Sequence, residues 1–145
     1  MTHLNAFTLR LTDYIIHNHP DRITDTAFIE QRGQAALTTF AECSRQGMSF
    51  EDANHQAAKV LYQGLLFSPY HMIMDILDEE FPNVTLVDTQ RGSLLMQMLA
   101  FVKPTIARYH NEENDDTFRG SYRYATAYAH TKRMINQFLH DNGLQ

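Results

Sequence analysis

Apolar residues recur at the spacing of an α-helix through most of this chain. In the first run, from Leu4 to Asn18, they are Leu4, Phe7, Leu11, Tyr14 and Ile15. Pro20 disfavours helical backbone at the residue before it, so this helix is predicted to end before His19. A second run starts at Ala27, with Thr24 or Asp25 as the expected N-cap and Gly47 as the expected end. Its apolar positions are Phe28, Ala36, Leu37, Phe40, Ala41 and Cys43.

Gly33 interrupts this second pattern. A glycine inside a helix costs about 1 kcal/mol relative to alanine. A helix that packs closely at this position would explain why a glycine stands there.

The stretch from Met48 to Pro82 carries the most complete set of folding signals. Ser49, with Asp52 three residues later, resembles a capping box. The helix after it is predicted to continue to Phe67, with Ala53, Ala57, Val60, Leu61 and Leu65 on its buried side. Ser68 and Pro69 then suit the N-cap and the first residue of another helix. That helix turns Ile73, Ile76, Leu77 and Phe81 inward and ends at Pro82.

The second half is less regular. Residues 83–88 have β-forming side chains without a partner run and are predicted to be a connector. Asp88 is the expected cap of the most apolar helix, 89–109, and Pro104 leaves open whether this helix is continuous. The acidic residues 110–118 predict a mobile loop. The last helix starts after Gly120 and Ser121, with a predicted apolar stripe of Tyr122, Ala125, Tyr128, Ala129, Ile135, Phe138 and Leu139 before Gly143.

The sequence therefore predicts an all-α fold, a compact bundle of about six helices that forms a single domain over residues 1–145. The hydrophobic content of 43% and the charged content of 20% are typical of a globular protein rather than a disordered one.

Several segments resemble an uncharacterised family of small helical proteins from Bacteroides-type bacteria that is often associated with conjugative elements. The matching residues are His19-Pro20-Asp21-Arg22, Phe28-Ile29, Gly64-Leu65-Leu66-Phe67-Ser68-Pro69-Tyr70 and the ending Gly143-Leu144-Gln145. The resemblance covers residues from about Leu4 to about Phe81 best, and no pattern matches from Asn83 to Thr117. It implies an all-helical fold and a bacterial cytoplasmic setting, and it implies no catalytic residue.

Charge and cysteine content exclude some classes of protein. The net charge of −5 disfavours general binding to nucleic acid. The single cysteine, Cys43, rules out an internal disulfide and a cysteine-based zinc site. The N-terminus has no signal-peptide pattern and no apolar run is long enough to cross a membrane, so a cytoplasmic protein is expected.

Two groups of histidines have the spacing of metal ligands. His17 and His19 follow each other in a His-x-His pattern, and His71 lies one turn before Asp75 on a predicted helix, with Asp78 and Glu79 next along the same side. A surface histidine at a helix C-terminus and the solvated face of an amphipathic helix explain the same patterns. We therefore assign no metal, cofactor-binding or catalytic residue, and Cys43 is expected to be a structural thiol.

The last helix differs from the rest of the chain because it is basic and rich in tyrosine. Arg119, Arg123, Tyr124, Lys132 and Arg133 form a candidate interaction surface for single-stranded nucleic acid or for an acidic protein. Alternatively, Tyr122 and Tyr128 face the core and the cations pair with the acidic segment 110–118.

These patterns leave the biochemical function open, and enzymatic activity with it. They favour a non-enzymatic protein that binds another protein or itself as a homodimer, or an accessory protein of a mobile element. The alternatives are a nucleic-acid accessory protein that uses the last helix and a small metal-dependent enzyme.

Overall fold

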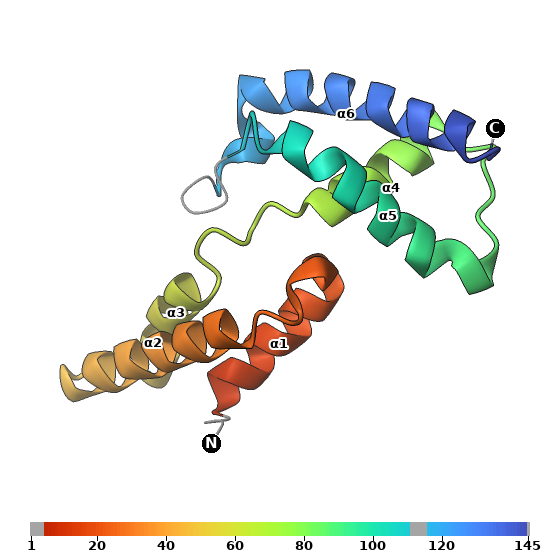
Figure 1. Ribbon diagram of the computed structural model, residues 1–145. Coiled ribbons are helices and arrows are strands. Elements are labelled where there is room, and N and C mark those ends of the chain that lie inside the picture. Colours follow the sequence, from red (N-terminus) through yellow and green to blue (C-terminus); the bar gives the residue numbers. More distant parts are fainter. Residues whose placement is uncertain (1–4, 111–115, 145) are drawn as a thin grey trace. The chain divides into compact units, whose positions relative to one another are not determined.

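The computed structural model describes residues 5–110 and 116–144, and over these residues it contains helices and no strand. Figure 1 shows the six α-helices in chain order. Their bounds are α1 Ala6–Asn18, α2 Thr26–Arg45, α3 Phe50–Leu61, α4 Pro69–Glu80, α5 Asp88–Ile106 and α6 Tyr122–Asp141, with short 3-10 helices η1 Pro20–Arg22 and η2 Phe118–Gly120. The all-α prediction is confirmed.

The chain divides into two compact units, Met1–Gln63 and Gly64–Gln145, here called unit 1 and unit 2. Unit 1 contains α1 to α3, and unit 2 contains α4 to α6. That the whole chain is a single domain stays a prediction.

In unit 1, α2 packs against both α1 and α3. The buried apolar side chains are Phe7, Leu11, Ile15, Ile29, Ala36, Ala53, Ala57 and Leu61. Gly33 of α2 lies against Thr8 of α1, where an added Cβ would be 2.9 Å from the Thr8 Cα. This close crossing explains the glycine inside the second helix.

The predicted caps of unit 1 are present. The Asp25 side chain accepts a hydrogen bond from the Phe28 amide, and Ser49 Oγ accepts one from the Asp52 amide. Gly47 has a φ of +89° and follows the end of α2, where the Met48 amide donates to the Cys43 carbonyl at 3.1 Å. A glycine takes this left-handed conformation at little cost, which is why the helix ends there.

The predicted end of the third helix at Phe67 is wrong. Helix α3 stops at Leu61, and Gly64 has a φ of +79°. Leu65 is buried but belongs to unit 2. The stretch Met48–Pro82 is therefore not one folding element, because the boundary between the units falls inside it.

In unit 2, Ser68 caps α4 as predicted, since its Oγ accepts the His71 amide at 3.1 Å. Leu86 is buried and Val84 packs against the same core, as expected for the connector. Helix α5 continues through Pro104 and ends at Ile106. Asp88 is its first residue rather than its cap, because Val87 occupies the N-cap position without a side-chain bond.

Of two predictions about the end of the chain, one extends beyond the described residues and the other is partly wrong. Residues 111–115 of the predicted mobile loop lie outside the described residues, but His110 and Phe118 at its ends are buried. In α6 the predicted stripe is wrong in its first half, since Tyr122 is 86% exposed and Ala125 and Ala129 are also exposed. The buried residues of α6 are Ala127, Thr131, Ile135, Phe138 and Leu139. Packing against the neighbouring helices buried Ala127 and Thr131, with Tyr124 and Tyr128 partly buried against the same core, and left Tyr122 exposed.

Candidate functional site

The candidate surface on η2 and α6 faces carboxylates of α4. Arg119 lies 3.5 Å from an Asp75 carboxylate oxygen, and the Lys132 ammonium lies 2.8 Å from Glu80. The Tyr128 hydroxyl donates to Glu79 at 2.6 Å. The cations therefore pair with α4, whereas the sequence suggested the segment 110–118 as their alternative partner.

This arrangement changes the titration of two groups. The hydrogen bond from Lys132 holds the pKa of Glu80 below its usual value. Desolvation, followed by the hydrogen bond to Glu79, raises the pKa of Tyr128 well above the usual tyrosine value. The contact therefore stabilises a neutral tyrosine and an ionised carboxylate, which are the ordinary charge states of these two groups.

Of the other members of the candidate surface, Tyr124 lies beside these pairs, with its ring centroid 6.2 Å from that of Tyr128. Arg123 donates to the Tyr109 carbonyl oxygen at 2.9 Å and lies over the ring of Phe118. The ring of Tyr124 packs among Phe67 and Phe118, and its burial raises its pKa. Arg133 is exposed. The five residues Arg119, Arg123, Tyr124, Lys132 and Arg133 therefore do not form one continuous basic face, and their role in binding stays a prediction.

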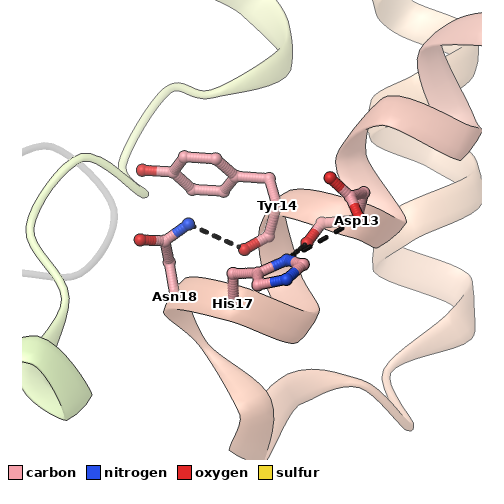
Figure 2. A network of polar contacts seen from close by, with 4 residues as sticks. All are labelled: Asp13, Tyr14, His17 and Asn18. Atoms are coloured by element: carbon pink, nitrogen blue, oxygen red, sulfur yellow. Dashed lines mark hydrogen bonds and ion pairs between the residues drawn. The ribbon is translucent and has the colours of Figure 1, made fainter.

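The two histidines at the end of α1 point to different environments. The side chain of His17 is exposed, with Nδ1 2.8 Å from the Asp13 carbonyl oxygen (Figure 2). The Asn18 amide in the same view donates to the Tyr14 carbonyl. His19 is buried beside the ring of Tyr14. One ring thus lies at the surface and the other in the core.

The second candidate cluster is also occupied by protein contacts. Asp75 pairs with Arg119, and the ring of His71 packs edge-on against Tyr70. Among the described residues, the structure shows no group of three or more His, Cys, Asp or Glu side chains that could hold a metal ion. Cys43 is half-buried near the end of α2.

A surface that the sequence did not predict lies in unit 1. Phe7 of α1, Phe40 of α2 and Phe50 of α3 form a row of rings that runs from the buried Phe7 to the exposed Phe50, here called the aromatic patch. Ring centroids are 5.9 Å apart for Phe7 and Phe40 and 5.5 Å apart for Phe40 and Phe50. Phe50 is 73% exposed, and Met48 two residues before it is 40% exposed. The sequence did contain a signal for this surface, because Phe50 is a large apolar residue outside the predicted buried stripe of Ala53 and Ala57.

No described helix is long and apolar enough to cross a membrane.

Comparison with known proteins places the chain in a family. A solved structure similar to it is that of protein PG0816 from Porphyromonas gingivalis, with a TM-score of 0.82 and 29% sequence identity over 96% of this chain and 92% of the other. No curated protein matches the chain significantly. The resemblance to an uncharacterised helical family is confirmed, while a link to conjugative elements stays a prediction. A family model matches residues 1–144, and the chain belongs to the family described as a domain of unknown function (DUF1896).

Proposed function

We propose that this chain is a non-enzymatic cytoplasmic protein that acts by binding protein, and that the aromatic patch binds a second copy of the chain. The exposed ring of Phe50 carries the proposal, since it adds to a row of rings from three helices. Aromatic side chains that become buried on association often dominate binding energy. A role as an accessory of a mobile element remains part of this proposal.

The charges around the aromatic patch favour a copy of the chain as the occupant. Arg10 lies over the ring of Phe7, and Glu51 and Asp52 follow Phe50 in the first turn of α3. A rim with both signs can meet its own opposite charges when the same surface of two copies pairs about a two-fold axis. A rim of one sign would instead favour a different, oppositely charged partner.

Binding of single-stranded nucleic acid through α6 is the runner-up. It requires cations that are available to phosphates, whereas Arg119 and Lys132 have carboxylate partners within unit 2. Such binding would weaken steeply with salt. Fluorescence anisotropy with a labelled single-stranded oligonucleotide at low and physiological salt tests it directly.

Sedimentation equilibrium tests self-association. We expect a concentration-dependent dimer for the wild type and a weaker dimer for Phe50→Ser. Fully burying one phenylalanine contributes about 1.5–3 kcal/mol, so the dissociation constant should rise by roughly tenfold or more. Tyr122→Ser is the matched control, because Tyr122 is at least as exposed as Phe50 but lies outside the aromatic patch.

Two outcomes contradict the proposal. If the wild type stays monomeric at the highest accessible concentration, the aromatic patch does not bind a second copy. A dimer that Phe50→Ser and Tyr122→Ser weaken equally uses some other surface.

A further inference from the structure

Two opposite charges lie close together at the edge of the aromatic patch. The Arg10 guanidinium of α1 lies 5.4 Å from the centre of the Phe7 ring and donates a hydrogen bond to the side-chain oxygen of Asn54 in α3 at 3.1 Å. Glu51 lies three residues before Asn54, and residues three apart are neighbours on the surface of a helix. The cation therefore lies about one helical turn from the Glu51 carboxylate, beside Phe50.

The exposed Arg10 side chain is held in position for a further contact. The ring of Phe7 and the oxygen of Asn54 both fix its guanidinium, so less side-chain freedom is lost when a partner binds. The hydrogen bond to Asn54 uses Nη1, whereas an arginine has five N–H donors in a planar fork that fits a carboxylate. Donors of Arg10 thus remain for an acceptor on another molecule.

The Glu51 carboxylate is also available. Glu51 is exposed in the first turn of α3. Within the described part of the chain, its side chain makes no ion pair or hydrogen bond. It can therefore bind a cation of another molecule without breaking a contact within its own chain.

A surface with two such charges fits a copy of itself. In a dimer with a two-fold axis, a contact between residue i of one copy and residue j of the other occurs twice, with the roles exchanged. An axis between the two charges therefore forms two ion pairs from one arrangement. It also keeps the exposed Phe50 ring inside the contact, because Phe50 directly precedes Glu51.

We infer that the second copy binds with Arg10 of each chain against Glu51 of the other. The rings alone do not fix how the two copies are oriented, whereas charges placed against their opposites favour one orientation and disfavour those that bring like charges together. This inference rests on the proposed self-association through the aromatic patch. It names the residues that make the surface specific for its own copy.

Mixing charge-reversed variants tests the pairing by sedimentation equilibrium. Arg10→Glu alone and Glu51→Arg alone each place like charges together twice in a dimer. The dissociation constant of each should therefore rise by roughly tenfold or more. In a mixed dimer of the two variants, both contacts again join opposite charges. An equimolar mixture should therefore dimerise about as tightly as the wild type, which also shows that both variants are folded.

Asp52→Arg is the matched control. Asp52 is an exposed acid in the same first turn, but it lies two residues from Asn54, and residues two apart do not face each other on a helix. Asp52→Arg alone should dimerise like the wild type. Its mixture with Arg10→Glu has the same overall charges as the mixture with Glu51→Arg, but it should dimerise less tightly.

Three outcomes overturn the inference. Charge variants that dimerise like the wild type, while Phe50→Ser still weakens the dimer, leave the proposed self-association intact and remove only the pairing of Arg10 with Glu51. Recovery in the double variant Arg10→Glu/Glu51→Arg without recovery in the mixture places the ion pair within one chain. A wild type that stays monomeric removes both the pairing and the proposed self-association.

Discussion

Thr8 of α1 lies directly against Gly33 of α2, and this contact sets how closely the two helices cross. A Cβ on Gly33 would lie 2.9 Å from the Thr8 Cα and 3.0 Å from its Cβ, and it would also overlap the Thr8 hydroxyl oxygen. Two of these neighbours are attached to the backbone rather than to the end of a flexible side chain. An added methyl group would therefore push the helices apart.

Gly33→Ala should destabilise unit 1 although alanine favours helix. Overpacking costs about 1–3 kcal/mol, which exceeds the gain of about 1 kcal/mol in helix propensity. Urea unfolding followed through amide signals of α1 to α3 measures the loss. Gly92→Ala is the control, because nothing lies within 4 Å of a Cβ at Gly92 in α5. It should stabilise α5 by up to about 1 kcal/mol, and equal effects of the two changes would contradict this account.

The contact between Tyr128 and Glu79 should make unit 2 sensitive to alkaline pH. The folded protein holds the pKa of Tyr128 above the value in the unfolded chain, which is about 10. The associated stability is therefore fully present below pH about 10 and is lost as pH rises toward the folded value. Tyr128→Phe removes this dependence. The difference in unfolding free energy between wild type and Tyr128→Phe should shrink from pH 8 to pH 12, and a constant difference would contradict the role of this hydrogen bond.

Phe118 should be essential to unit 2, although its position next to an acidic segment suggests a surface residue. It is fully buried, with ring centroids 4.7 Å from Phe67 and 5.0 Å from His110. Phe118→Ala should cost about 3–5 kcal/mol of unfolding free energy, measured by urea titration. Phe101→Ala is the control within the same unit, because Phe101 is 42% exposed. Phe101→Ala should cost about 1–2 kcal/mol of unfolding free energy. A similar loss for both variants would show that burial does not determine the cost.

Sequence and structure agree where a structural feature depends on neighbours in the chain. The caps at Ser49 and Ser68 each bond an amide three residues later, and Gly47 and Gly143 take left-handed conformations at helix ends. A cap requires one side chain and a nearby amide, so a short segment contains all the information.

The candidate site could be predicted only in its residue types. The cations and tyrosines of α6 were identified from composition, but their carboxylate partners on α4 are about fifty residues away in the chain. The aromatic patch likewise joins Phe7, Phe40 and Phe50 from three helices. Spacing within one helix does not reveal which other helix will face it.

The sequence by itself determined the all-α class and most helix ends, because local capping and periodicity are sufficient for these. Only the tertiary structure decided that α3 stops at Leu61, that α6 buries Ala127 and Thr131 rather than Tyr122, and that Phe118 lies in the core. These features depend on the free energy of packing between segments distant in sequence, which can override local apolar patterns.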